Sequence, residues 1–196
     1  AGYALSWLVS LFGPVREVTA FSALTFPDKG DGTAELNLAK DFSVGCLVFG
    51  SGVIARLTSG LAAPRDRSLT ILGDKGSITV RDLWDNRSAV HLEDSSHPRP
   101  FLHKALRRIE GELGRALPFK LVPGRRLKYG AGARRTLPSY PSQIDFMAGI
   151  AAQAKMIETG EPAAFSGAVA LHITELALAL HAGDRQPQPY HVKSTF

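Results

Sequence analysis

Hydrophobic residues at the start of the chain recur at helical spacing, and the spacing then changes to that of strands. Apolar side chains at positions 5, 8, 9, 11 and 12 predict a helix that Gly13-Pro14 ends. Residues 15–26 alternate with a period of two, which predicts a long strand. A polar turn over 27–33 and a short strand over 34–38 are expected next. The chain therefore opens with one helix followed by strands.

Two pairs of apolar runs in the middle of the chain are each joined by a glycine turn. Residues 42–49 and 53–61 flank Gly50-Ser51-Gly52, and residues 68–72 and 77–81 flank Asp74-Lys75-Gly76. Because glycine readily adopts the positive φ of tight hairpins, both pairs predict antiparallel strands. One face of 42–49 carries Phe42, Val44, Cys46 and Val48, while Leu47 and Phe49 make the other face apolar too. This pattern predicts a sheet that is covered on both sides.

The remaining chain holds one more strand and then helices. A strand is expected over 88–92 and a basic amphipathic helix over 101–117, followed by irregular backbone over 118–141. Two further helices are predicted over 142–160, capped by Ser142, and over 167–180, with an edge strand over 190–193. The order favours an α+β fold, in which helices cover one face of a large, mostly antiparallel or mixed sheet. Its open face would be available for oligomer contact.

The composition describes an ordinary globular chain. It has 196 residues, of which 44% are hydrophobic and 21% charged, and we expect a single domain over 1–196. We expect no membrane-spanning segment, because the apolar run 168–180 is short and interrupted. One cysteine excludes an internal disulfide, and we expect Cys46 to be a buried small hydrophobe rather than a reactive thiol. This cysteine usage agrees with a cytoplasmic location.

Positive charge is concentrated in an excursion over about 99–141. Within it, residues 104–135 carry ten Lys and Arg against two Glu, a net +8 in a chain of net +5. We interpret the segment first as a solvated excursion, next as a rim over an anionic ligand. Nucleic-acid binding comes last, because Phe119 and Tyr129 are too few aromatics for base stacking.

Motifs that carry chemistry on their own are missing from the sequence. Neither a G-x-G-x-x-G between strand and helix nor a P-loop occurs, and the Gly50-Ser51-Gly52 turn has no helix behind it to bind phosphate. The six histidines are scattered, so no metal site is expected. His172 is interpreted as a hydrogen-bonded structural residue, with a catalytic role as the alternative.

Three segments together resemble one known family. FGSGVIARL matches F-x-x-G-x-x-x-R-L, LTILGDKGSITV matches L-x-I-x-G-x-K-G-x-I-x-V, and ALHITE matches A-L-H-x-x-E, all of which resemble the C-terminal domain of the glucose–fructose oxidoreductase/inositol dehydrogenase (Gfo/Idh/MocA) family. The first twenty residues are similar to the helix where that family's two domains join. The resemblance covers most of 1–100 and 142–183.

The resemblance implies an NAD(P)-dependent oxidoreductase that acts on a sugar, polyol or related hydroxy compound. NAD or NADP would be bound mainly by an N-terminal Rossmann domain, which this sequence lacks, so we expect the sequence to be part of a longer protein. The chain would be the substrate-binding and oligomerisation domain, forming a homodimer or homotetramer through the open sheet face. A nucleic-acid partner is not expected.

Four residues are candidates for the substrate site. The resemblance implies that Tyr3 takes the His/Tyr position of a family motif, where a phenol can donate a hydrogen bond or proton to a carbonyl oxygen. The alternatives for Tyr3 are orientation of the substrate only, or packing against the sheet. Arg65 and Asp66 in the loop between the hairpins, and Trp84, would bind the substrate. The structural alternatives are an exposed loop pair for Arg65 and Asp66 and an aromatic cover of the sheet edge for Trp84.

The second hypothesis for the whole chain is a non-enzymatic β-sheet dimerisation module with a basic arm for an acidic partner.

Overall fold

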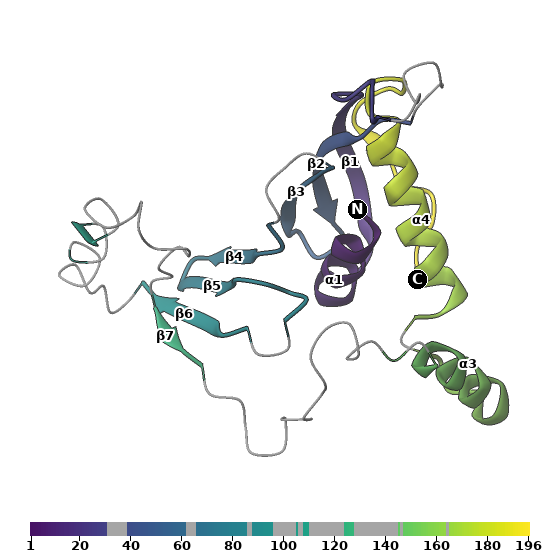
Figure 1. Ribbon diagram of the computed structural model, residues 1–196. Helices are drawn as coiled ribbons and strands as arrows, with labels where there is room; N and C mark the ends of the chain where they lie inside the picture. The colour runs from purple at the N-terminus through teal and green to yellow at the C-terminus, as the bar shows by residue number, and fades with distance from the viewer. Residues whose placement is uncertain are drawn as a thin grey trace. The chain divides into compact units, whose positions relative to one another are not determined.

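The computed structural model describes residues 1–30, 39–61, 66–85, 88–95, 105, 108–109, 124–127, 145, 147–163 and 165–196 (Figure 1). Two compact units make up the chain. The first unit comprises Ala1–Pro64 and Phe146–Phe196, and the second comprises Arg65–Asp145. Each unit has one four-stranded antiparallel sheet among these residues.

The sheet of the first unit has the strand order β3-β2-β1-β8. Its strands are β1 (Val15–Ala23), β2 (Phe42–Phe49), β3 (Ile54–Gly60) and β8 (Tyr190–His191). The predicted turn at residues 50–52 joins β2 to β3, and Gly52 has a φ of 86°, which explains the need for glycine there. The hairpin prediction is therefore confirmed.

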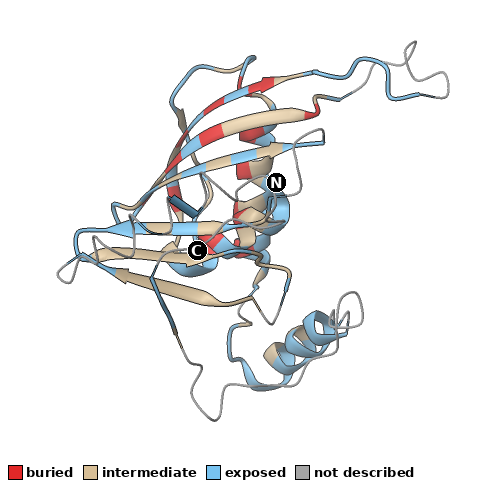
Figure 2. Ribbon diagram, turned by 60° about the vertical axis from the view of Figure 1, so that its left-hand side comes forward, coloured by how far each residue is buried: buried red, intermediate tan, exposed pale blue. Residues whose placement is uncertain are grey.

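Two helices line the inner face of this sheet. α1 (Gly2–Phe12) packs on α4 (Gly167–His181), and α4 crosses β1 and β2. Opposing pairs Val15/Phe49 and Val18/Leu47 are almost completely buried on this face. Figure 2 colours the buried residues of the strands and helices red. A bulge between Val15 and Glu17 lets Val15 and Val18, three residues apart, share the same face. The rest of the core comes from Ala20 of β1 and from the helices: Leu5, Leu8, Val9, Val169, Leu176, Ala179 and Leu180.

Small residues allow the C-terminal end of α4 to lie directly on the sheet. Gly45 of β2 is paired with Ala20 of β1, and a methyl group at Gly45 would run into the side chain of Leu180. A methyl group at Gly183 would lie 2.6 Å from the carbonyl oxygen of Ala20. The helix and the sheet therefore approach so closely that two positions have no room for a side chain.

The outer face of the sheet is open in the described part of the chain. Phe21 is 56% exposed and Ile54 is 71% exposed, and Cys46 is also exposed. The expectation that Cys46 is buried is therefore wrong. Both faces of β2 are apolar in sequence, and the helices cover the face of Leu47 and Phe49, whereas Cys46 lies on the opposite face.

The third described helix is α3 (Ala148–Thr159), and no residue in it is buried. It ends as predicted at Gly160, which has a φ of 73°. The predicted cap, Ser142, lies outside the described residues. The predicted strand over 34–38, most of the helix over 101–117 and nearly all of the segment 118–141 also fall outside them.

The second unit holds the sheet β4-β5-β6-β7, with β4 (Leu69–Gly73), β5 (Gly76–Val80), β6 (Val90–Asp94) and β7 (Arg125–Arg126). The predicted turn at Asp74-Lys75-Gly76 joins β4 to β5, and Gly76 has a φ of 144°. The α+β class is confirmed, with the strands divided between two sheets. Among the described residues, no helix is long and apolar enough to cross a membrane.

The tight seat of α4 on the sheet yields a first prediction. Gly183→Ala should lower the free energy of unfolding by about 2 kcal/mol, because the new methyl group meets main-chain atoms of Ala20 that cannot rotate away. Urea denaturation measures the change. Gly149→Ala on α3 is the matched control, since nothing lies within 4 Å of its new methyl group. It should raise stability by about 0.5 kcal/mol. Equal effects of the two substitutions would contradict the close approach at Gly183.

Candidate functional site

Tyr3 lies in the first turn of α1, where it is 72% exposed. The other end of the helix is firmly attached to the sheet. The Ser51 hydroxyl donates to the Phe12 carbonyl at 3.0 Å, and the rings of Phe12 and Phe49 meet edge to face at 5.5 Å. The buried face of α1 carries Leu5, Leu8 and Val9. The attached C-terminal end of α1 therefore holds Tyr3 in the first turn of the helix, where its side chain faces outward.

Trp84 lies at a corner of the second unit together with two residues that the sequence did not indicate. The guanidinium of Arg67 lies 5.0 Å from the centre of the indole ring and donates to the Asp82 carboxylate at 2.6 Å. The Trp84 main-chain N–H also donates to Asp82, at 2.8 Å. Arg67 and Asp82 are joined by an isolated parallel bridge. One face of the indole is thus held under a paired cation, an arrangement that stabilises the corner.

Asp66 adjoins this corner and is exposed. Its carboxylate accepts a hydrogen bond from the Ser68 N–H at 2.9 Å, which fixes the turn into β4. Arg65 lies outside the described residues. The structure therefore brings Asp66 and Trp84 to the same corner through Arg67, whereas Tyr3 belongs to the other unit. Arg67 and Asp82 are fifteen residues apart, and no local spacing rule connects an arginine with an acid at that separation.

A serine, a histidine and a glutamate meet where the C-terminal segment packs on α4. The His172 Nε2 accepts the Val15 N–H at 3.0 Å, and Nδ1 lies 3.0 Å from the carbonyl of Ser194. A carbonyl only accepts, so Nδ1 carries the proton. The Ser194 hydroxyl donates to Glu175. This is not a hydrolytic triad, because the main chain occupies the nitrogen that would have to act as base, and His172 is completely buried.

Burial lowers the pKa of His172, although the carbonyl of Ser194 and the charge of Glu175 oppose the shift. The imidazole is therefore held neutral, and the interpretation of His172 as a structural residue is confirmed. The side chain joins the start of β1 to the end of the chain through α4.

Glu175 fastens the C-terminal segment with four hydrogen bonds. Its Oε1 accepts from the Tyr190 hydroxyl at 2.7 Å and from the Lys193 N–H at 2.8 Å; its Oε2 accepts from the N–H and hydroxyl of Ser194. Burial by itself would raise the pKa of this carboxyl, but the four donors together lower it to about 2. The same contact raises the pKa of Tyr190. Glu175 is therefore an ionised structural anchor.

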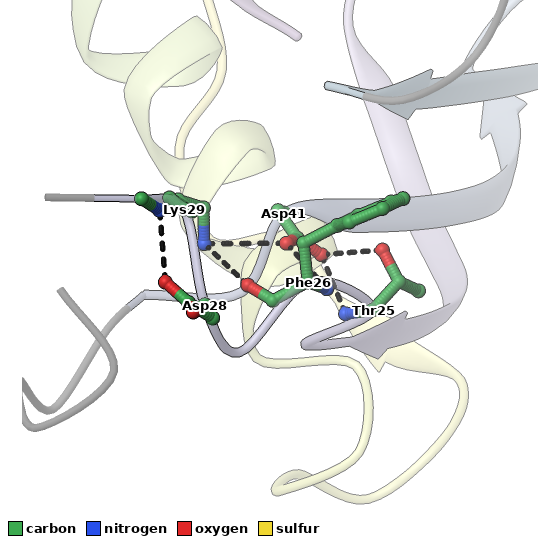
Figure 3. A network of polar contacts seen from close by, with 6 residues as sticks. Thr25, Phe26, Asp28, Lys29 and Asp41 are labelled. Carbon is green, nitrogen blue, oxygen red and sulfur yellow. Dashed lines mark hydrogen bonds and ion pairs between the residues drawn. The ribbon is translucent and has the colours of Figure 1, made fainter. Parts of the chain in front are cut away.

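A second carboxylate that accepts several hydrogen bonds, that of Asp41, lies at the end of the connection between β1 and β2. Asp41 accepts the Thr25 N–H and hydroxyl, both at 2.7 Å, and the Phe26 N–H at 3.0 Å, and pairs with Lys29 at 3.2 Å (Figure 3). The Thr25 N–H is the largest cause of its strongly lowered pKa. With its side chain only 1% exposed, Asp41 has a structural role.

Lys40, the residue before Asp41, attaches the connection between β1 and β2 to the residues that follow α4. Lys40 forms an ion pair with Asp184 and donates to the Ser22 hydroxyl at 3.2 Å. Burial, followed by the charge of Arg185, lowers the pKa of Lys40. The Ser22 hydroxyl in turn donates to the His181 carbonyl at 2.8 Å, so this cluster is also part of the scaffold.

The described residues do not fit a resident metal or dinucleotide. No group of three or more His, Cys, Asp and Glu side chains among them is placed to hold a metal ion. The Gly50–Gly52 turn joins two strands rather than a strand and a helix, so it does not present a helix N-terminus to a phosphate.

Comparison with known proteins places these observations in a class, that of oxidoreductase C-terminal domains. Residues 1–79, which include Tyr3, match the family described as the GFO/IDH/MocA C-terminal domain. The resemblance inferred from the sequence is thereby confirmed. No curated protein sequence matches the chain.

Solved structures extend the likeness in fold to nearly the whole chain. Aldose-aldose oxidoreductase from Caulobacter crescentus, complexed with glycerol, is 17% identical with a TM-score of 0.60, covering 97% of this chain and 45% of its own. The WlbA dehydrogenase from Bordetella pertussis, in complex with NADH and UDP-GlcNAcA, is 16% identical with a TM-score of 0.56, covering 98% and 44%. An oxidoreductase from Agrobacterium radiobacter, in complex with NAD+, L-tartaric acid and magnesium, is 13% identical with a TM-score of 0.57, covering 97% and 47%. The chain therefore spans a little under half the length of these proteins.

The anchor at Glu175 predicts a specific pH dependence. Since the pKa of Glu175 is lowered on folding, its stabilisation is complete above about pH 4.5 and is lost as the pH falls towards 2. Glu175→Gln should lower the free energy of unfolding by about 2 kcal/mol at pH 7. The difference from the wild-type protein should shrink below pH 4.5 in urea denaturation at several pH values. Glu158→Gln, at an exposed position of α3, should change little at any pH. A difference that does not vary with pH would rule out the ionised anchor.

Proposed function

We propose that the chain is the substrate-binding and oligomerisation domain of an NAD(P)-dependent oxidoreductase. The intact protein transfers hydride to or from a sugar, polyol or related hydroxy compound. The observation that carries the proposal is the match of residues 1–79 to the C-terminal domain of an oxidoreductase family. Both units serve one domain over 1–196 in this proposal, and the single cysteine agrees with a cytoplasmic location.

Tyr3 is the proposed catalytic residue of this chain. Its exposed place in the first turn of α1 supports this assignment. A phenol donates a hydrogen bond or a proton to the oxygen of a carbonyl compound, and it accepts the proton again in the reverse direction. Nothing in this role requires burial of Tyr3 in the sheet core, which agrees with its 72% exposure.

The corner at the start of β4 supplies the proposed substrate-binding residues Arg65, Asp66 and Trp84. An exposed carboxylate such as that of Asp66 can accept hydrogen bonds from substrate hydroxyl groups, and an indole offers an apolar surface to the C–H side of a sugar ring. Arg67 already covers one side of Trp84, so only the remaining surface of the indole serves this purpose.

The nicotinamide cofactor is assigned to a Rossmann domain of the intact protein, because the glycine turn at residues 50–52 joins two strands and presents no helix N-terminus to a dinucleotide phosphate. NADH and NAD+ are named in the complexes of the Bordetella pertussis and Agrobacterium radiobacter proteins, and both fold likenesses support cofactor use of this kind. The bound cofactor supplies or accepts the hydride.

Removal of the Tyr3 hydroxyl tests the catalytic assignment. Tyr3→Phe should lower kcat of the intact protein by about 10²-fold with little change in KM, because a phenyl ring cannot donate a proton. Absorbance of the reduced cofactor at 340 nm gives the rate. Ser10→Ala, on the exposed side of the same helix, should leave both constants unchanged. A higher KM with unchanged kcat would assign Tyr3 to substrate orientation, and unchanged constants would remove it from the site.

The open face of the first sheet is the proposed contact between copies of the chain. Phe21, Ile54 and Cys46 lie exposed on it, and their neighbours Phe42, Val44 and Val48 widen the apolar surface. Such a surface is unusual on a free monomer. A homodimer or homotetramer would cover it, and a twofold axis would place the same strands of two copies together.

A charge placed on this face should separate the copies. Ile54→Glu should shift the protein to the monomer in sedimentation velocity, because the carboxylate would lose its hydration in the contact. The same change at the exposed Leu178 of α4 should leave the oligomer intact. Cys46 reports independently, since it is the sole thiol and should react more slowly with iodoacetamide in the oligomer than in the Ile54→Glu monomer. Equal reaction rates would place the contact elsewhere.

The second hypothesis is a non-enzymatic dimerisation module with a basic arm over 104–135. Like the first proposal it uses the open sheet face for dimerisation, but it assigns no catalytic activity to the protein. Most of that arm lies outside the described residues. Turnover by the intact protein, lost on Tyr3→Phe, would exclude this hypothesis. A dimer that binds polyanions and turns over no hydroxy compound would support it.

A further inference from the structure

The second sheet has two chemically different faces. Side chains of directly paired residues in antiparallel strands point to the same side. One side carries the apolar residues Leu69, Ile71, Ile78, Val80, Val90 and Leu92. The opposite side carries one continuous polar row, with Thr70 paired to Thr79, Thr79 to His91, and His91 to Arg126. Neighbouring strands are about 4.8 Å apart, so this row presents four polar side chains side by side.

His91 has an unsatisfied nitrogen in this row. Its Nδ1 is buried and has no hydrogen-bond partner among the described residues. Leaving such a group unpaired costs about 1–3 kcal/mol, so a partner for it is expected. Thr79, beside it, is partly buried, whereas Thr70 and Arg126 at the two ends are exposed. The row is thus open to a ligand at its ends and has an unsatisfied nitrogen near its middle.

The chemistry of the row favours a negatively charged partner. Two hydroxyls, an imidazole and a guanidinium can all donate hydrogen bonds, and Arg126 adds a permanent positive charge. The acid on the same face, Glu93, lies two residues from His91 on β6 and already has an interaction partner of its own. A set that is rich in donors and carries a guanidinium matches the oxygens of a phosphate or a carboxylate.

We propose that the row Thr70–Thr79–His91–Arg126 binds the anionic oxygens of a small molecule, a phosphate or a carboxylate group. Arg126 binds two of the oxygens, and the ring of His91, which is directly paired with it, turns outward so that Nδ1 in its N–H tautomer donates to one of them. The site lies wholly within the second unit and does not rest on the proposed oxidoreductase activity. It assigns one of the positive charges of the basic segment 104–135, that of Arg126, to a specific site.

Two adjacent arginines provide a matched test. Arg126 is paired with His91 on the polar side, whereas Arg125 is paired with Leu92 and lies on the apolar side. Arg126→Gln and Arg125→Gln remove the same charge from neighbouring positions. The intact protein is titrated with inorganic phosphate and, separately, with acetate at constant ionic strength. The ring signals of His91, identified by their loss in His91→Phe, are followed by NMR.

The proposal expects saturable shifts of the His91 signals and at least tenfold weaker binding in Arg126→Gln, with less than a twofold change in Arg125→Gln. Stronger binding of phosphate than of acetate would identify the ligand as a phosphate compound, and the reverse order a carboxylate. Equal weakening in the two arginine variants would show diffuse attraction only and overturn the site. The absence of saturable shifts, or preferential binding of an oligonucleotide to both variants alike, would also overturn it. Circular dichroism of each variant establishes that the fold is kept.

Discussion

The close seat of α4 on the first sheet is the constraint on which this unit depends. At its C-terminal end the helix touches the main chain of β1, because Ala20, Gly45 and Gly183 leave no side-chain bulk between them. Further towards its N-terminus, His172 connects the helix to the start of β1 and to the C-terminal segment by two hydrogen bonds to main chain. The first contact is steric and the second is polar. Together they fix the distance between α4 and the sheet and the rotation of α4 about its own axis. The place of α1, and so the exposed position of Tyr3, follows from this arrangement.

Polar groups in the first unit are used mainly to attach irregular segments to this framework. Glu175 holds the last residues of the chain, while Lys40 and Asp41, adjacent in sequence, hold the connection that follows β1 from two sides. In each case a buried or half-buried charge is neutralised by an ion pair or by several N–H and O–H donors, which is the condition under which burial of a charge is tolerated. These clusters resemble catalytic sites in composition, and their saturation identifies them as structural.

The sequence predicted the hairpins and helix ends well, because each rests on a local requirement. Gly52, Gly76 and Gly160 all have positive φ at the expected turns. The prediction from the sequence was wrong where both faces of a strand were equally apolar. Either face of β2 could have been buried, so the exposure of Cys46 depended on which face α4 would cover. That choice is made by the small residues at positions 20 and 45, whose role appears only once strands and helix are assembled.

Of the residues in the proposed site and around it, Tyr3, Asp66 and Trp84 were proposed from the sequence, whereas Arg67 and Asp82 were not. The first three stand out by residue type within short segments, whereas the pairing of Arg67 with Asp82 depends on a bridge between the two ends of a hairpin. Likewise, six histidines without any spacing pattern gave no reason to separate His91 from the others. Only the cross-strand register distinguishes it.

The shortness of β7 has a consequence for how this protein can evolve. The strand consists of two arginines, and the pairing with β6 alone determines which of them faces His91. An insertion or deletion of one residue before β7 that shifts its register by one would make the two arginines exchange faces, although neither arginine is itself changed. The number of residues before β7 would then control the chemistry of this surface as effectively as a point mutation.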